Sequence, residues 1–274
     1  MSLPSPAADR TAIVTGASSG IGAALARELA GRGHQVTLVA RSADKLAELA
    51  AEITATGVRA DILAADLGDR EARAALLGRV EALGLVPSIL VNCAGISTLG
   101  PVHKATPDAE IAMVELDVVA VVDLCTRFLP AMVARGTGAV LNVASTGAFQ
   151  PLPGQAGYGA SKAFVLSYTQ SLSGELRGTG VTATVLCPGP VDTGFGERAG
   201  FTSEEAHGAL PSVMWESPEV VARVGINGLA KGAMVAVPGL ANRAAAALVP
   251  FLPKRLLVPI LSRRHPVCAE PLAG

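Results

Sequence analysis

Short apolar runs alternate with longer amphipathic segments along most of the chain. The runs lack regular polar alternation, and they lie at 11–15, 36–40, 59–65, 88–93 and 139–144. Such runs are typical of strands whose two faces are both buried. The segments between them have the length and the polar face of helices. With right-handed crossovers, this order predicts an α/β fold: a doubly wound parallel sheet of Rossmann type, flanked by helices on both faces.

The composition limits what this fold can do. Of 274 residues, 50% are hydrophobic and 3% are aromatic, so the predicted core consists mainly of small aliphatic side chains. No linker or change of composition interrupts residues 1–274, which are therefore predicted to be a single domain. A net charge of −1 argues against nucleic acid as a partner. The four cysteines and four histidines match no zinc spacing, so neither a metal site nor disulfides are predicted.

The two ends of the chain differ from its centre. Residues 1–10 contain prolines and no apolar core of signal-peptide type, which predicts a flexible segment on a cytoplasmic protein. Residues 240–274 form an apolar extension with basic residues, in which Pro250, Pro253 and Pro259 are expected to interrupt a long helix. Packing beside the active site or a subunit contact is the preferred interpretation. An interfacial helix on an anionic membrane surface is the alternative.

A glycine-rich turn joins the first predicted strand to the first helix. Gly16 permits a tight turn, Gly20 allows backbone to approach a pyrophosphate, and Gly22 allows close packing of helix on strand. The helix N-terminus that follows favours an anion. The candidate cofactor-binding residues of this turn are Gly16, Ser18, Ser19, Gly20, Ile21 and Gly22.

Arg41 follows the second strand, at the position where an acidic residue would bind a ribose 2′-hydroxyl. A guanidinium instead suits a 2′-phosphate, with which it forms charge-assisted hydrogen bonds. The sequence therefore favours NADP over NAD as cofactor.

Ser145, Tyr158 and Lys162 are the candidate catalytic residues. Tyr158 and Lys162 are four residues apart, so on a helix they share one face. An ammonium near a phenol lowers the pKa of the phenol, and a phenol tuned toward neutrality is a general acid and base. Ser145, at the end of a predicted strand, would hydrogen-bond the substrate oxygen.

Four separated motifs give the sequence a specific resemblance to the short-chain dehydrogenase/reductase family over about residues 10–240. The motifs are Thr15-Gly16-Ala17-Ser18-Ser19-Gly20-Ile21-Gly22, Asn92-Cys93-Ala94-Gly95, Ser145 with Tyr158-Gly159-Ala160-Ser161-Lys162, and Pro188-Gly189-Pro190-Val191-Asp192-Thr193. The resemblance implies that Tyr158 is the general acid/base, that Lys162 also binds the nicotinamide ribose, and that Ser145 holds the substrate oxygen. It further implies a cofactor site that includes Asp66 and Leu67 at the adenine, Asn92, Ala94 and Gly95 along the adjacent wall, and Pro188, Gly189, Val191 and Thr193 at the nicotinamide.

Two positions depart from the family pattern. Cys93 replaces a common asparagine, and a small thiol packs in its place. Asp117 stands where the family usually has an active-site asparagine that holds a relay water. Its carboxylate either pairs with Lys162 or is incidental, with the backbone carbonyl holding the water, and the second interpretation is preferred.

The leading function is an NADP-dependent oxidoreductase that interconverts a carbonyl and a secondary alcohol on a largely apolar small molecule. A flap at 194–215 and the residues Phe149, Pro151 and Leu152 either line its pocket or pack on the body of the protein. The alternatives are a non-catalytic cofactor-binding regulatory or scaffold protein, and an epimerase or dehydratase on the same fold. Apolar stripes on the helices predicted at 108–135 and 155–177 suit a homodimer or homotetramer.

Overall fold

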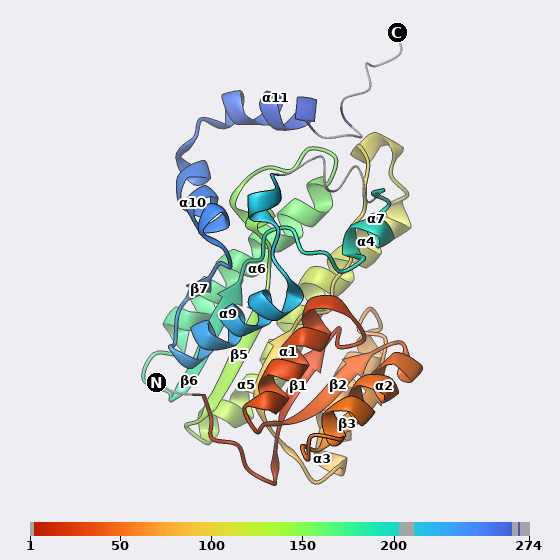
Figure 1. The fold of residues 1–274 in the computed structure, drawn as a ribbon, viewed down its shortest axis with the longest axis vertical. Coiled ribbons are helices and arrows are strands. Elements are labelled where there is room, and N and C mark those ends of the chain that lie inside the picture. The colour runs from red at the N-terminus through yellow and green to blue at the C-terminus, as the bar shows by residue number, and fades with distance from the viewer. Residues whose placement is uncertain (1–2, 203–210, 265–267, 269–274) are drawn as a thin grey trace.

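A seven-stranded parallel sheet forms the centre of the computed structural model, which describes residues 3–202, 211–264 and 268 (Figure 1). Its spatial order is β3-β2-β1-β4-β5-β6-β7, and every neighbouring pair is parallel. The strands are β1 (Arg10–Thr15), β2 (Gln35–Ala40), β3 (Ala60–Ala64), β4 (Val86–Asn92), β5 (Gly138–Val143), β6 (Val181–Leu186) and β7 (Val235–Ala236). The predicted doubly wound fold is confirmed.

Helices cover both faces of the sheet, and each layer closes its own hydrophobic core. One layer contains α1 (Gly20–Gly31), α2 (Ala43–Thr54) and α9 (Pro218–Ala230). The other contains α3 (Arg70–Ala82), α5 (Ala120–Ala134) and α6 (Ala156–Glu175). Smaller elements surround the site: η1 (Val102–Lys104), α4 (Pro107–Val114), the π-helix η2 (Glu115–Val119), η3 (Thr146–Phe149), α7 (Phe195–Ala199), η4 (Ser212–Met214), α10 (Leu240–Leu248), η5 (Val249–Phe251) and α11 (Lys254–Arg264).

Helix α2 shows why these segments are helical. Its buried residues are Leu46, Leu49 and Ile53, which share one face at helical spacing. The central strands, by contrast, are buried on both sides, as β5 is over its whole length, whereas the edge strand β3 is partly exposed. Each fully buried aliphatic side chain contributes about 1.5–3 kcal/mol relative to an exposed one. The two packed layers fix the sheet. Because its strands are parallel, their carboxyl ends all lie at one edge.

The order of the strands reverses between β1 and β4, which opens the crevice where such sheets bind ligands. The hydroxyl of Thr15 accepts hydrogen bonds from the amides of Cys93 (2.9 Å) and Ala94 (3.1 Å). Gly16 has a φ of +69°, and a Cβ on it would lie 2.9 Å from the Cα of Ala94. The ends of β1 and β4 are thus locked together at this crevice.

Three segments differ from their sequence-based predictions. The helix predicted at 108–135 contains the π-helical turn η2, which interrupts the regular helical ladder. Residues 3–9 are not a free segment: Leu3 packs against the core, and the amide of Gln35 donates to the carbonyl of Ala7 at 3.0 Å. Pro259 does not end a helix but lies inside α11.

Candidate active site

In the turn between β1 and α1, the glycine positions leave no room for a side chain. A Cβ on Gly22 would collide with the carbonyl oxygen of Gly16. Gly20 has a φ of +56°, and a Cβ on it would lie 2.9 Å from the Cβ of Thr193. Ser19 precedes α1 with extended backbone, and its side chain forms no capping hydrogen bond. A tight turn below an uncapped helix N-terminus, with the loop after β6 lying over it, fits the pyrophosphate of a dinucleotide.

Residues at the ends of β2 and β3 extend this cradle. Arg41 and Ser42 are exposed between β2 and α2. Asp66 is also exposed, and its carboxylate accepts a hydrogen bond from the amide of Gly68 at 2.9 Å. Leu67 is buried. The two turns thus present a cation and a carboxylate at the sheet edge where the adenosine half of a dinucleotide would lie.

The side chain of Asn92 is buried inside the protein, although the family resemblance places Asn92 along the wall of the cofactor site. Its amide donates to Oδ1 of Asn142 at 2.8 Å. Asn142 in turn donates to the hydroxyl of Thr169 at 2.9 Å. The Asn92 side chain therefore ties β4 to β5 and α6, and only main-chain atoms are left to face a cofactor. These hydrogen bonds satisfy the amide nitrogen of Asn92 and both polar atoms of the Asn142 side chain, each of which would otherwise cost about 1–3 kcal/mol.

Ser145, Tyr158 and Lys162 converge as predicted. Ser145 follows β5, and its hydroxyl accepts a hydrogen bond from the amide of Gly147 at 3.0 Å. The same hydroxyl acts to lower the pKa of the Tyr158 phenol. The ammonium of Lys162 lies 5.6 Å from the ring centre of Tyr158. Lys162 is almost fully buried on α6. A hydroxyl, a phenol and an ammonium thus surround one point at the end of the sheet.

Asp117 forms a buried ion pair with Lys162. Its Oδ2 lies 2.9 Å from the Lys162 ammonium, and the side chains of the aspartate and the lysine are 0% and 7% exposed. Oδ1 accepts a hydrogen bond from the amide of Ile96 at 2.9 Å. The preferred interpretation, an incidental side chain, is therefore corrected: the carboxylate pairs with the lysine. The π-helical turn η2 carries Asp117, and such turns are frequent at functional sites.

The ion pair changes the electrostatics expected at Tyr158. Burial raises the pKa of Tyr158 above its ordinary value, and Asp117 adds to that increase, while Lys162 and the Ser145 hydrogen bond act against it. Burial lowers the pKa of Lys162, but Asp117 and Tyr158 outweigh burial and raise it. The sequence predicts a lowered pKa for Tyr158, whereas here the pKa is raised, because burial of the phenol, to which Asp117 adds, outweighs the opposing effects of Lys162 and Ser145. Tyr158 is a neutral phenol and Lys162 a cation at neutral pH.

The neighbouring thiols carry no charge. Burial raises the pKa of Cys93 to about 12 and that of Cys187 to about 12. Both therefore act as small apolar side chains, in agreement with the packing role predicted for Cys93.

The predicted pocket residues divide into two groups. The ring of Phe195 lies 5.8 Å from that of Tyr158 at an angle of 49°, so the first part of the predicted flap contacts Tyr158. Leu152 instead packs against Gly147 and Gly159, and Phe149 packs against the core. Residues 203–210 of the predicted flap lie outside the described residues.

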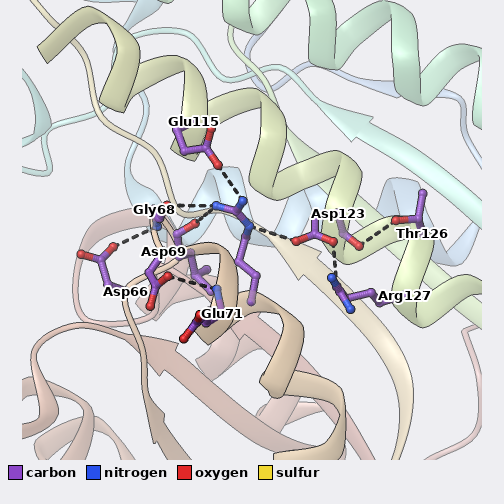
Figure 2. A network of polar contacts seen from close by, with 10 residues as sticks. Asp66, Gly68, Asp69, Glu71, Glu115, Asp123, Thr126 and Arg127 are labelled. Carbon is purple, nitrogen blue, oxygen red and sulfur yellow. Dashed lines mark hydrogen bonds and ion pairs between the residues drawn. The ribbon is translucent and has the colours of Figure 1, made fainter. Parts of the chain in front are cut away.

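Arg73 is a buried residue of the site region that the sequence reading missed. It is 1% exposed, and it donates to the carbonyls of Leu67 (2.8 Å) and Gly68 (3.1 Å). It also pairs with Glu115 at 2.6 Å and Asp123 at 3.0 Å. Figure 2 shows this network, which joins the turn after β3 to η2 and α5. The one guanidinium therefore holds both the adenosine-side turn and the helical turn that carries Asp117.

The helical spacing of Arg73 with apolar residues indicates that Arg73 is buried. Arg73, Leu76 and Val80 are the buried residues of α3 and share one face, so an arginine occupies the apolar side of this helix. A cation at such a position needs partners, because an unpaired buried charge is very costly. The partners were not visible in the sequence, since Glu115 and Asp123 lie more than forty residues away.

Replacing Arg73 with methionine is expected to lower the free energy of unfolding by about 2–4 kcal/mol. The variant leaves Glu115 and two carbonyls without their Arg73 donor and leaves Asp123 with Arg127 alone, and breaking a buried pair costs about 3–5 kcal/mol. Glu115 is 36% exposed, which reduces that cost. Urea unfolding of the variant measures it. Arg127→Met is the matched control, because Arg127 pairs with the same Asp123 but is 35% exposed, and we expect a loss below about 1 kcal/mol. Equal losses in both variants would contradict the role of Arg73.

The fold and this cluster define the chain as a Rossmann-type protein with a dinucleotide cradle beside a serine, a tyrosine and a lysine. The family model for short chain dehydrogenases matches residues 10–202. The chain belongs to the short-chain dehydrogenase/reductase family.

Individual relatives agree with this assignment. A short chain dehydrogenase of Pseudocercospora fijiensis is 42% identical over 190 residues, 68% of this chain and 61% of that protein. The very-long-chain 3-oxoacyl-CoA reductase of Anas platyrhynchos is 37% identical over 184 residues, 65% of this chain and 58% of that protein. The matches thus span less than two thirds of these two relatives. A short-chain dehydrogenase from Sphingobium yanoikuyae in complex with NADPH has a TM-score of 0.76 and 31% identity, and the similarity covers 97% of this chain and 98% of that one.

Proposed function

We propose that this protein is an NADP-dependent oxidoreductase that interconverts a carbonyl and a secondary alcohol, with Tyr158 as the general acid/base. The observation that carries the proposal is the buried Lys162–Asp117 pair, whose ammonium lies 5.6 Å from the ring centre of Tyr158. When bound, the nicotinamide would supply or accept the hydride. The alternatives of a scaffold protein or an epimerase gain no support from any specific feature, whereas a complete proton-transfer cluster supports catalysis.

The protonation state of the cluster suits carbonyl reduction. A neutral phenol has a proton to give to the oxygen of a carbonyl that accepts hydride. The hydroxyl of Ser145 would hydrogen-bond that oxygen as its negative charge develops. Lys162, held charged by Asp117, would stabilise the phenolate that remains on Tyr158. Phe195 beside the tyrosine would exclude water and favour an apolar substrate.

Arg41 supports NADP as the cofactor. The exposed guanidinium lies at the end of β2, where a ribose 2′-phosphate would meet it, and no carboxylate stands at this position to repel that phosphate. Several solved relatives hold the same dinucleotide, among them an actinorhodin polyketide ketoreductase with NADPH (TM-score 0.75, 30% identity, 84% of this chain and 95% of that one).

Replacing Arg41 with alanine is expected to weaken NADPH binding about 10- to 100-fold and to leave NADH binding unchanged. Hydrogen bonds to charged groups contribute about 1.5–3 kcal/mol, and only NADPH carries the 2′-phosphate. Titrations of intrinsic fluorescence or calorimetry with both dinucleotides measure the effect. Arg177→Ala, which removes an exposed cation beyond the end of α6, is the matched control. Equal weakening for both dinucleotides would show that Arg41 does not select between them.

The proposed activity is tested by following NADPH consumption with a panel of aliphatic, cyclic and aromatic ketones. Consumption that depends on both ketone and enzyme supports the proposal. Binding of NADPH without turnover on any ketone or alcohol would support the scaffold alternative. Conversion of a substrate without net cofactor change would indicate an epimerase or dehydratase.

The helices α4, α5 and α6 offer a surface for self-association. Ile111, Val114, Val119, Val133 and Phe164 are exposed apolar residues on these helices and η2. These side chains support the proposed homodimer or homotetramer, because apolar stripes of this kind are buried in symmetric assemblies.

A further inference from the structure

The C-terminal extension is anchored to the body by its inner side. Asn242 of α10 is fully buried, donates to the carbonyl of Met214 at 2.9 Å, and packs against Gly189 in the loop after β6. Helix α10 also contacts η3, which follows Ser145. Packing beside the site, one of the preferred interpretations of this extension, is therefore observed for α10.

The outer side of the extension is apolar. Six of its large hydrophobic residues are between 47% and 86% exposed: Leu240, Leu248, Phe251, Leu252, Leu256 and Ile260. They lie on α10, η5 and α11, apart from Leu252, which lies between η5 and α11. Figure 1 shows α11 at the end of the long axis opposite α3, with α10 between α11 and the body of the protein. A concentration of exposed apolar side chains on one element indicates an interaction surface.

The charge of the extension indicates which kind of partner would bind this apolar surface. Residues 240–264 contain five cations and no aspartate or glutamate: Arg243, Lys254, Arg255, Arg263 and Arg264. A symmetric contact with a second copy would place identical patches face to face, and the cations of one copy would repel those of the other. An anionic bilayer supplies both the apolar layer and the opposite charge.

We propose that α10, η5 and α11 form a docking surface for anionic phospholipid bilayers, on which they lie in the interface. In the described part of the chain, none of the helices could span a bilayer. α7 lies near the same end of the molecule in Figure 1, and its Phe195 contacts Tyr158. Taken with the proposed function, docking would bring the site close to a source of apolar carbonyl substrates.

Flotation of the full chain on vesicles tests the surface without reference to activity, so its failure is distinct from a failure of the proposed reaction. Vesicles of phosphatidylcholine with roughly one third phosphatidylglycerol are compared with pure phosphatidylcholine. We expect binding to the anionic vesicles, weak binding to the neutral ones, and a loss of binding when salt is raised from about 0.1 M to about 1 M, which shortens the screening length from about 10 Å to about 3 Å.

Two double variants separate the electrostatic and apolar contributions. Arg255→Gln with Arg263→Gln is expected to weaken binding to the anionic vesicles about 30-fold. Lys254 is kept, because its ammonium lies 3.5 Å from the carbonyls of Val249 and Pro250. Phe251→Ser with Ile260→Ser is expected to weaken binding at least about tenfold, since two apolar anchors are lost. Arg177→Gln with Lys231→Gln, the same charge change on exposed residues elsewhere, should bind like the wild type.

The outcomes are decisive once circular dichroism has shown that the variants are folded. Absence of flotation on anionic vesicles would overturn the proposal, as would flotation that neither double variant weakens. Absence of flotation together with self-association that Phe251→Ser and Ile260→Ser abolish in sedimentation velocity would assign the surface to a second copy.

Discussion

Replacing Tyr158 with phenylalanine is expected to lower kcat for ketone reduction by about 10²–10⁴-fold while NADPH binding changes little. The variant removes only the phenolic oxygen, and a positioned general acid contributes a factor of this size. The ring still packs against Phe195, so the shape of the site is preserved. Steady-state kinetics with the best ketone of the panel and a separate NADPH titration measure the two quantities.

Tyr168→Phe is the matched control for this variant. Tyr168 lies on the same helix, but its ring stacks on Phe164 at 5.8 Å and its hydroxyl contacts Cys125 in the core, away from Lys162. We expect near wild-type kcat for this change. If Tyr158→Phe retained full activity, the proton would have another source, and the proposed role of Tyr158 would have to be abandoned.

Replacing Asp117 with asparagine is expected to preserve most of the activity and to move the alkaline limb of the pH–rate profile to lower pH. The negative charge of Asp117 raises the pKa of Tyr158, so its removal lowers that pKa. Ketone reduction needs the protonated phenol, and the activity is lost as the pH rises through this pKa. The asparagine oxygen still accepts from Ile96, which keeps the loop after β4 in place.

Profiles of kcat against pH for the wild type, Asp117→Asn and Asp108→Asn check this expectation. Asp108 is exposed near the start of α4, and its loss should leave the profile unchanged. Asp117→Leu provides a second test, because it leaves a buried ammonium without a carboxylate and should cost about 3–5 kcal/mol of stability. An unaltered profile in Asp117→Asn would separate the carboxylate from the titration of Tyr158.

The C-terminal extension and the ion-pair network show what the sequence pattern did not predict. The alternation of apolar runs and helical segments determined the parallel sheet, since burial of both faces requires continuous apolar strands. The same pattern could not tell that Pro259 lies within a helix or that α10 is held by Asn242. Those outcomes depend on contacts between segments that are distant in sequence.

Within the site, the partners of Asp117 and Arg73 were likewise not predictable from the sequence pattern. The sequence identified Ser145, Tyr158 and Lys162, because their spacing on a strand end and a helix fixes their approach locally. Whether the Asp117 carboxylate reached Lys162 depended on a π-helical turn, and its effect on the pKa of Tyr158 depended on burial. The partners of Arg73 came from α5 and η2.

The sequence by itself determined the fold class, the glycine turn and the three residues proposed to carry catalysis, because these follow from local periodicity and short spacings. Only the tertiary structure decided the charge balance around Tyr158, the inward orientation of Asn92 and the outward apolar face of α10 and α11. Electrostatic and packing energies depend on distances through space, and a one-dimensional pattern does not contain them.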